Sequence, residues 1–353
     1  MKMSKKFLQA ACVPLSLTFA ALVSGCSGAL PAQNAAARAS SGASAPSAAP
    51  AALGDVITFK YGHVDGTTSP KQIFAEKLNE LLAEELKGKY QLEIYPNSQL
   101  GGERDLVEGV IMGTVDMTAP ANTVAANFVD ELNSVELPYL FEDYDHADKV
   151  FQGEIGEGFL EDINKNGMVG LAFFEAGFRQ FSNNTRPIES IDDVAGLRLR
   201  VMENKMHQAL WTALGADPVT MSWADAYTSI QQGAIDGIEV PLSITYSNNV
   251  QDVCKYLAIT DHIYTATPVI MSQAAYGRIA PEDVEKFDEL VRQAAAEALR
   301  YNRELCEQAL DDLQQAGMTV TYPDIGPFQK AMEAVYAQYP QYADIIQEIK
   351  ALV

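Results

Sequence analysis

Residues 196–205 read GLRLRVMENK, a stretch in which two arginines stand at alternate positions among apolar residues. Side chains alternate between the two faces of a β-strand, so the leucines and the valine point one way while Arg198 and Arg200 point the other. The simplest interpretation is a half-exposed strand with both guanidinium groups in water. If the sheet is covered on both faces, Arg200, nearer the carboxyl end of the strand, needs an anionic partner from the protein or a ligand.

The segments on both sides of this strand alternate between strand and helix patterns. The strand candidates are residues 56–61, 90–95, 115–118, 168–174, 235–240, 256–260, 267–276 and 318–322, and the helix candidates are 70–86, 103–112, 205–214, 222–232, 281–315 and 328–352. This alternation predicts an α/β fold with a parallel sheet. The longest helix, opened by Pro281 and closed by Gly317, would extend roughly 50 Å, so we expect it to touch both halves of the molecule.

The N-terminus has the features of an export signal. Residues 1–25 combine basic residues, an apolar run too short and broken to span a bilayer, and small residues before Cys26. Residues 23–26, VSGC, resemble the lipobox of bacterial lipoproteins, and ordinary signal-peptidase cleavage is the alternative. We expect an extracytoplasmic protein anchored to a bacterial membrane by lipid on Cys26, with residues 26–54 as a disordered Ala/Ser/Pro linker before the folded part.

The chain is strongly acidic, with 47 acidic and 25 basic residues and a formal net charge of −22. Such a surface repels phosphate backbones, which argues against a nucleic-acid partner. It also repels anionic ligands at long range. A site for an anion therefore needs local positive charge.

Motifs of the common enzyme and metal-site classes do not occur. The four histidines are scattered, and the chain has no HExxH, GxSxG, GxxxxGK or CxxC and no GxGxxG after a strand. We therefore expect no metal, no cofactor and no catalysis. One enzymatic alternative is a secreted glycoside hydrolase that uses Glu175 and Glu239, since both lie in or beside apolar strands where burial raises a carboxyl pKa. Pairing of these glutamates with nearby arginines is simpler.

A second arginine has a setting similar to that of Arg200. In residues 169–188, VGLAFFEAGFRQFSNNTRPI, Arg179 interrupts an aromatic run and follows Glu175 by four residues. We expect Glu175 to be its partner when no ligand is bound. A purely structural ion pair is the alternative.

Five stretches in register resemble one known family, the extracytoplasmic solute-binding proteins of tripartite ATP-independent periplasmic (TRAP) transporters, of DctP type. They are YPNSQLGGERDLVEGVIMGTVDM (95–117), ELPYLF (136–141), GFRQFSNNTRPI (177–188), GLRLRVMEN (196–204) and LGADPVTMSWADAYTSIQQGAIDGIEVPL (214–242). The resemblance covers about residues 57–349. It implies a two-lobed α/β fold like that of class II periplasmic binding proteins, with a ligand cleft between the lobes and a long spanning helix.

The resemblance also implies the extent of each lobe and the function. Lobe I would comprise residues 55–176 and 266–305, and lobe II residues 177–265 and 306–353. The lobes would close over a small carboxylate, such as a C4-dicarboxylate, a sugar acid or a keto or hydroxy acid, for delivery to the small and large integral-membrane subunits. An ABC-type solute-binding lipoprotein and a sensory or scaffolding lipoprotein are the alternatives.

Site residues follow from the same resemblance. Arg200 matches the family arginine that makes a two-pronged salt bridge to the ligand carboxylate, and Arg179 matches one that lies beside the ligand. Trp223 would place its indole against the ligand, with a core tryptophan as the alternative. His63 matches a position that faces the cleft, and Asn122 is a candidate for hydrogen bonding.

One stretch departs from the family pattern. Relatives commonly read DGxENP where residues 236–241 read DGIEVP, and we place Glu239 and Val240 in the ligand site. Val240 replaces an asparagine that touches the ligand in many relatives, so an amide donor is lost. This puts a sugar acid such as sialic acid in doubt as the ligand. Elsewhere, Cys254 and Cys306 either pair in an oxidising compartment or remain buried thiols.

Overall fold

The computed structural model describes residues 56–353. The predicted signal segment (1–25), the lipidation candidate Cys26 and the predicted linker (26–54) lie outside the described residues. The strands are β1 (Ile57–Gly62), β2 (Tyr90–Tyr95), β3 (Met117–Thr118), β4 (Met168–Asn183), β5 (Arg198–Val201), β6 (Asp217–Thr220), β7 (Gly237–Pro241), β8 (Tyr256–Ala258), β9 (Tyr264–Ser272) and β10 (Thr319–Thr321).

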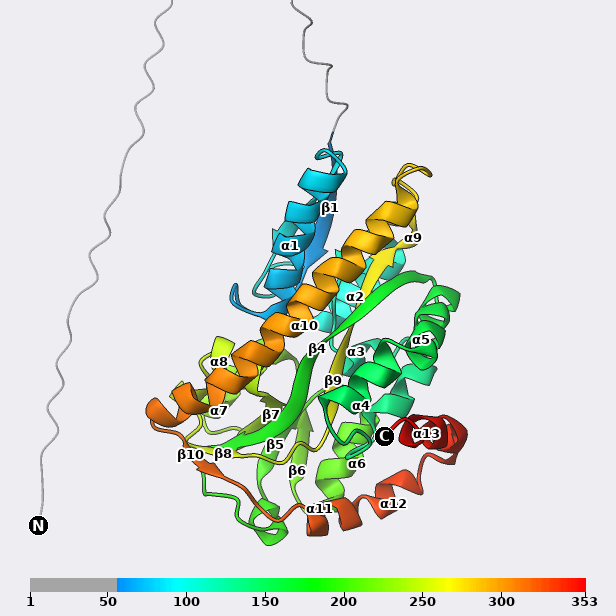
Figure 1. The fold of residues 1–353 in the computed structure, drawn as a ribbon. Coiled ribbons are helices and arrows are strands. Elements are labelled where there is room, and N and C mark those ends of the chain that lie inside the picture. The colour runs from blue at the N-terminus through cyan, green and yellow to red at the C-terminus, as the bar shows by residue number, and fades with distance from the viewer. Residues whose placement is uncertain (1–55) are drawn as a thin grey trace, which may run out of the picture. The chain divides into compact units, whose positions relative to one another are not determined.

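Helices connect and cover these strands (Figure 1). The α-helices are α1 (Pro70–Glu85), α2 (Glu103–Met112), α3 (Asn122–Ala125), α4 (Tyr144–Phe151), α5 (Glu154–Lys165), α6 (Lys205–Ala213), α7 (Trp223–Gln231), α8 (Leu242–Ser247), α9 (Gln273–Tyr276), α10 (Val284–Gln315), α11 (Gly326–Ala331), α12 (Glu333–Tyr336) and α13 (Ala343–Lys350). The 3₁₀ helices are η1 (Asp130–Glu136), η2 (Ile191–Val194), η3 (Val250–Asp252) and η4 (Pro340–Tyr342).

The sheet is mixed, with the strand order β2-β1-β3-β9-β4-β7-β5-β6. Pairing is parallel among β1, β2 and β3 and among β5, β6 and β7. In the middle, β9 runs antiparallel to both β3 and β4, and β4 runs antiparallel to β7. The predicted α/β class is confirmed, but the sheet is mixed where the alternation predicted a parallel one. The chain crosses the middle of the sheet along β4 and returns along β9, so these two strands must run in opposite directions.

The long strand β4 extends well beyond its predicted end at residue 174, because the aromatic run continues into the arginine motif. Its pairing with β9 shifts register between Glu175 and Gly177, which marks a bulge. Gly177 has φ +93°, and a Cβ atom there would lie 2.9 Å from the Tyr144 hydroxyl. Glycine at this position therefore lets the strand bend against a packed aromatic side chain.

The long helix α10 begins at Val284 rather than at the predicted Pro281. The carboxylate of Asp283 accepts hydrogen bonds from Lys89 Nζ at 2.8 Å and from the Tyr90 hydroxyl at 2.9 Å. These bonds tie the residues before the helix to β2. At the other end, Gly317 follows the helix with φ +100°, as the sequence predicts.

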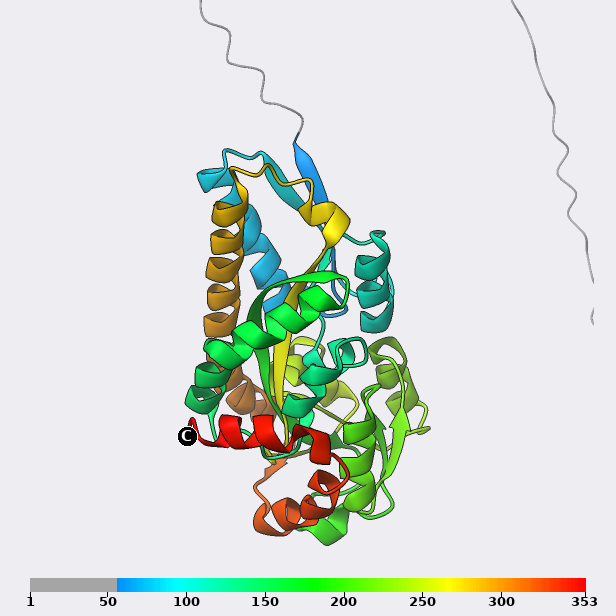
Figure 2. The same cartoon turned by 90° about the vertical axis from the view of Figure 1, so that its right-hand side faces the viewer.

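Helix α10 packs against α1, β4 and α8, and Figure 1 shows it running diagonally from beside α9 toward α8. Its first half, including Phe287 and Leu290, belongs to a buried cluster with Phe59 and Phe74. Leu313, near its end, belongs to a different cluster with β7 and β8. The expectation that this helix touches both halves of the molecule is confirmed. Helices α11 to α13 lie beside α6 and η1, at the end of the unit away from β1 (Figure 2).

Candidate ligand-binding site

Arg200 lies buried on β5 without a carboxylate partner in the described part of the chain. It is 3% exposed, and its Nε donates to the main-chain oxygen of Met221 at 3.0 Å. The guanidinium carbon lies 5.8 Å from the ring centroid of Trp223, within cation–π range. Burial lowers the pKa of Arg200 to about 10, with Glu239 partly opposing and Arg179 adding to the shift. The group thus remains positively charged at neutral pH while largely shielded from water.

The other arginine of β5 has the opposite setting. Arg198 is exposed, and its guanidinium binds both carboxylate oxygens of Asp236, with Nη2 to Oδ1 at 2.7 Å and Nε to Oδ2 at 3.1 Å. Leu199 and Val201 are buried on the opposite face of the strand. The alternation predicted from the sequence is confirmed. The simple interpretation that puts both arginines in water holds for Arg198 and is wrong for Arg200.

Arg179, on β4, is bound to Glu239 of the neighbouring strand β7. Its Nε donates to the carboxylate and its Nη2 to the main-chain oxygen of Glu239, while Nη1 donates to the Thr265 hydroxyl at 3.2 Å. The expected pair with Glu175 is therefore wrong. A spacing of four residues brings side chains together on a helix, but on a strand it separates them by roughly 13 Å.

Glu175 instead joins a cluster on the helix α10 side of β4. It accepts hydrogen bonds from the Tyr264 hydroxyl at 2.7 Å, from Asn302 at 3.2 Å and from Arg303 at 3.1 Å. It is fully buried, as is Glu239. Neither glutamate lines the pocket described below, so they do not form a carboxylate pair there.

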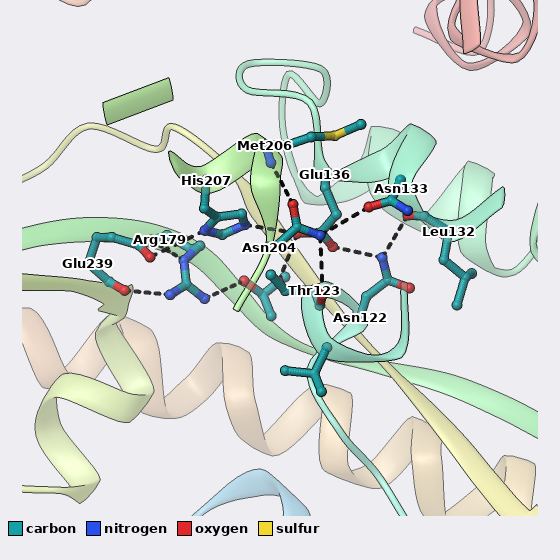
Figure 3. A network of polar contacts seen from close by, with 12 residues as sticks. Asn122, Thr123, Leu132, Asn133, Glu136, Arg179, Asn204, Met206, His207 and Glu239 are labelled. Atoms are coloured by element: carbon teal, nitrogen blue, oxygen red, sulfur yellow. Dashed lines mark hydrogen bonds and ion pairs between the residues drawn. The ribbon is translucent and has the colours of Figure 1, made fainter. Parts of the chain in front are cut away.

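Two buried histidines complete the surroundings of Glu239 (Figure 3 shows one of them, His207). His207 Nδ1 lies 3.3 Å from Oε1 of Glu239, and His262 Nε2 lies 3.2 Å from Oε2. Burial opposes the ionisation of Glu239, but Arg179 and then His207 outweigh it and hold the pKa of this carboxyl well below its ordinary value. Burial lowers the pKa of His262. For His207 burial acts in the same direction, but Glu239 and Glu136 outweigh it and raise the pKa.

The polar network continues from His207 to the segment before α4 (Figure 3). Nε2 of His207 lies 2.9 Å from Oε2 of Glu136 in η1. The two carboxylate oxygens of Glu136 also accept hydrogen bonds from Asn122 Nδ2 at 2.7 Å and from the Thr123 hydroxyl at 2.8 Å. Asn204, which caps α6, donates to the main-chain oxygen of Thr123 at 3.3 Å. The network therefore connects β4, β7 and α6 with α3 and η1.

A pocket of about 170 Å³ opens beside this network, where β4, β5, β7 and β9 meet the first turns of α1, α2 and α7. This is smaller than the roughly 300–1,000 Å³ typical of drug-sized ligands, so the pocket suits a small molecule. It is lined by Val64, Asp65, Lys71, Gly102, Glu103, Arg104, Asp105, Ala121, Val124, Ala176, Arg179, Arg200, Met202, Glu203, Met221, Ser222, Trp223, Val240, Pro241, Ile244, Thr265 and Thr267. Four of the residues predicted for the ligand site are among them: Arg200, Arg179, Trp223 and Val240.

The other three predicted site residues are buried beside the pocket and do not line it. His63 Nε2 lies 2.9 Å from Oε1 of Gln72, and burial lowers the pKa of its imidazole. Asn122 is fully buried and uses its amide nitrogen on Glu136. Glu239 accepts a hydrogen bond from Arg179 Nε on the side of Arg179 away from the pocket. As placed in this structure, these side chains orient their neighbours.

The structure adds a charged group that the sequence interpretation missed. Lys71, in the first turn of α1, lies 3.2 Å from Asp65 Oδ2 and 2.5 Å from Glu103 Oε1. All three side chains are largely buried and line the pocket. They follow β1 and open α1 and α2, at the carboxyl ends of parallel strands. The rule that singled out Arg200 would have found them as well.

Within residues 56–353, no group of three or more His, Cys, Asp and Glu side chains is placed to hold a metal ion. None of the helices in this range has both the length and the apolar character needed to cross a membrane. Cys254 and Cys306 are free and buried, and burial raises their thiol pKa to about 12 and about 11. The disulfide left open by the sequence is not formed.

The chain is similar to known proteins of one family. The family described as bacterial extracellular solute-binding protein, family 7 (DctP) matches residues 61–342. The C4-dicarboxylate-binding periplasmic protein DctP of Rhodobacter capsulatus is 35% identical over 76% of this chain and 80% of its own. A solute-binding protein of Roseobacter denitrificans is 32% identical over 87% of this chain and 92% of its own.

Solved structures agree with these relatives. A TRAP periplasmic solute binding protein from a Polaromonas species, bound to D-erythronate, superimposes with a TM-score of 0.81 at 32% identity, over 84% of this chain and 98% of its own. Another from Sulfurospirillum deleyianum, with bound succinate, gives a TM-score of 0.78 at 29% identity, over 84% and 99%. The predicted resemblance is confirmed. The chain belongs to the bacterial extracellular solute-binding proteins of family 7, the DctP family of TRAP transporter receptors.

Proposed function

We propose that this chain captures a small organic acid by closing on its carboxylate with Arg200, and delivers it unchanged to the membrane subunits of a TRAP transporter. The observation that supports this most directly is the buried guanidinium of Arg200, which lines the pocket and lacks a carboxylate partner among the described residues. A desolvated, unpaired cation is costly to bury. A ligand carboxylate supplies the missing counter-charge.

The ligands of similar proteins support a carboxylate. The Polaromonas protein was solved with D-erythronate and the Sulfurospirillum protein with succinate, and the Rhodobacter relative is described as binding C4-dicarboxylates. These molecules differ in length and hydroxylation, and all carry a carboxylate. That shared group is what Arg200 is placed to recognise.

The other residues of the pocket take supporting roles in this proposal. Arg179 already faces Glu239, so it offers hydrogen-bond donors to the ligand with little net charge. Trp223 covers Arg200, and Val240 makes one wall apolar. Direct ligand contacts by His63, Asn122 and Glu239 stay predictions.

Affinity in the micromolar range is within reach of this arrangement. A hydrogen bond to a charged group contributes about 1.5–3 kcal/mol, and a dissociation constant of 1 μM corresponds to about −8 kcal/mol. Two prongs on Arg200, a few further polar contacts and an apolar wall together reach that value. The guanidinium must be kept from water for each prong to count fully.

Opening and closing of two lobes would give the ligand access to this site. We place lobe I at residues 55–176 and 266–305 and lobe II at 177–265 and 306–353. The first boundary falls at the bulge of β4, where Gly177 allows a bend. The others fall within β9 and α10, the elements that connect the two halves of the sheet. Bending at these positions would signal ligand binding to the membrane subunits.

We further propose that the mature protein is held at a bacterial membrane, on its periplasmic or cell-surface face, by lipid on Cys26. The support is the sequence of residues 23–26, VSGC, after a signal-like segment. Lipid chains anchor a protein without a spanning helix. Mass spectrometry of the purified N-terminus distinguishes a diacylated cysteine from an unmodified residue released by ordinary cleavage.

The proposed function is tested by the ligand that the protein retains. Denaturing the purified protein and analysing the released small molecules by mass spectrometry should show an organic acid. A thermal-shift screen should then show stabilisation by that acid and none by its methyl ester, which lacks the anionic oxygen. Stabilisation by the ester equal to that by the acid would contradict carboxylate recognition.

A further inference from the structure

The proposed function assigns no role to the charged cluster formed by Asp65, Lys71 and Glu103. These residues line the same pocket as Arg200 but come from the loop after β1 and from the first turns of α1 and α2. In the sheet, β1 is separated from β5, which carries Arg200, by four other strands. The pocket therefore has two charged walls that originate in different halves of the sheet.

The cluster has an excess of negative charge. The Lys71 ammonium is 3.2 Å from Asp65 Oδ2 and 2.5 Å from Glu103 Oε1, and no other cation of the described chain pairs with either carboxylate. Although burial disfavours the charged form, the two carboxylates raise the pKa of Lys71, so it stays protonated. One ammonium facing two carboxylates leaves a net charge of about −1 on this wall.

One carboxylate oxygen of the cluster is left without a hydrogen-bond donor. Asp65 is 3% exposed, and its Oδ2 is buried and accepts no hydrogen bond from residues 56–353. The one close polar contact of this oxygen in the described chain is the ion pair with Lys71 Nζ at 3.2 Å. Glu103, in contrast, also accepts the main-chain N–H of Ala121 at 3.1 Å. A hydrogen-bond donor on the ligand would add a second partner to Asp65 Oδ2, which at present has only the ion pair.

No other cation of the pocket offers a second carboxylate a good partner. Arg104 lies at the surface, where its Nε binds Glu108 at 3.0 Å and its guanidinium stacks over Phe128. Arg179 is neutralised by Glu239. Among the described residues that line the pocket, Arg200 is the one cation without a carboxylate within 4.0 Å.

We infer that the ligand is a monocarboxylic acid with hydroxyl groups toward its far end, and that the Asp65–Lys71–Glu103 cluster excludes dicarboxylic acids. This rests on the proposed function, because it takes Arg200 to hold the carboxylate. A hydroxyl group satisfies Asp65 Oδ2 and adds no charge. A second carboxylate would be pressed against a wall that is already negative, with no cation free to neutralise it.

Matched pairs of sugar acids test this inference. D-Erythronate and meso-tartrate share four carbons and their hydroxyl configuration, and D-gluconate and D-glucarate share six. In each pair a terminal CH₂OH of the monocarboxylate becomes a carboxylate. Isothermal titration calorimetry on the purified protein will show which of the two pairs binds more tightly. In that pair, the monocarboxylate should bind at least tenfold more tightly than the dicarboxylate.

Substitutions in the cluster should change this preference in a graded way. Asp65→Asn should reduce the preference at least threefold, and Asp65→Asn combined with Glu103→Gln should reverse it, because the wall then carries the positive charge of Lys71. The glutamine keeps an acceptor for the Ala121 N–H. Glu80→Gln is the control: it removes an exposed carboxylate of α1 that pairs with Lys77 outside the pocket, and should leave the preference unchanged. Circular dichroism and thermal melting check that each variant folds.

The outcomes separate the inference from the proposed function. Equal or tighter binding of the dicarboxylate, lost in Arg200→Ala, would overturn the inference and leave carboxylate capture standing. Failure to bind any of the four acids, with Arg200-dependent binding of succinate or pyruvate instead, would do the same. Binding that survives Arg200→Ala would overturn both.

Discussion

Arg198 and Arg200 lie two residues apart on β5, and only Arg198 has a carboxylate partner among the described residues. Arg198 stays in solvent with Asp236, whereas Arg200 is buried beneath Trp223. Arg200 is thus a buried positive charge that forms no ion pair with a described carboxylate. A ligand carboxylate that fills this position removes an electrostatic cost already present in the folded protein.

Glu239 is expected to be essential for the stability of the fold around the pocket. Glu239→Gln removes the counter-charge of Arg179 and of protonated His207, and leaving buried charges without a partner costs about 3–5 kcal/mol. Urea denaturation should therefore show a large loss in the free energy of unfolding. Glu304→Gln, which breaks an exposed pair with Arg300, is the control and should change little. Similar losses in the two variants would contradict the role given to Glu239.

His207 should make the stability of the protein fall as the pH rises above about 6.5, the pKa of histidine in the unfolded chain. Its pKa is raised in the folded state, where Glu239 and Glu136 outweigh burial, and is about 6.5 in the unfolded chain. A raised pKa gives stability that is fully present below about pH 6.5 and is lost as the pH rises through the folded value. The difference in unfolding free energy between wild type and His207→Gln should thus shrink with rising pH.

His63 supplies the control for this pH dependence, because burial lowers its pKa. A lowered histidine pKa has the opposite sign: stability is lost as the pH falls from about 6.5 toward the folded value. The difference between wild type and His63→Gln should therefore decrease with falling pH. Denaturation series from pH 5 to 9 measure both differences. Slopes of the same sign would show that the charge states assigned to the two histidines are wrong.

Gly177 should be intolerant of a side chain for a reason beyond its backbone conformation. Gly177→Ala would place Cβ 2.9 Å from the hydroxyl of Tyr144, whose ring packs against Phe178 and Tyr264. Gly167→Ala is a matched control, with φ +83° against +93° and open space around its Cβ. Both variants meet the backbone penalty of about 1–2 kcal/mol.

The steric contact should therefore appear as a difference between the two glycine variants. We expect Gly177→Ala to lose about 1 kcal/mol or more beyond Gly167→Ala in the free energy of unfolding, the range found for overpacked sites. Thermal or urea melts measure it. Equal losses would mean that Tyr144 moves aside without cost, and that the bend of β4 is not supported by this contact.

The sequence reveals much of the pocket because one simple rule applies at several strands. Residues at the carboxyl ends of parallel strands face the place where ligands gather, and this rule places Arg200 correctly in the pocket. Trp223, which opens α7, and Val240, near the end of β7, line it as well. The same rule, applied to β1 and the helix starts after it, would have found Lys71 and Glu103.

Partners of buried charges were harder to predict. Arg179 pairs with Glu239, sixty residues away, because β4 and β7 are neighbours in the sheet, and sequence spacing carries no information on that pairing. The start of α10 was misplaced for a similar reason. Pro281 is a typical first residue of a helix, but Asp283 is held by Lys89 and Tyr90 on β2, and the helix begins only after it.

Arg200 and Arg198 lie on the same strand, so replacing each in turn by alanine gives the sharpest test of whether Arg200 holds the ligand. Isothermal titration calorimetry should be run with the acid retained on purification, on wild type, Arg200→Ala and Arg198→Ala. Both variants remove one guanidinium from the same strand, so the difference between them reports the position and not the general loss of positive charge. Arg200→Lys adds a variant that keeps the charge but not the two-pronged geometry.

Arg200→Ala should weaken binding of this acid by more than tenfold, which corresponds to about 1.4 kcal/mol, while Arg198→Ala should stay within about twofold of wild type. Arg200→Lys should lie between them. An affinity of Arg200→Ala within about twofold of wild type would contradict the claim that this guanidinium holds the ligand.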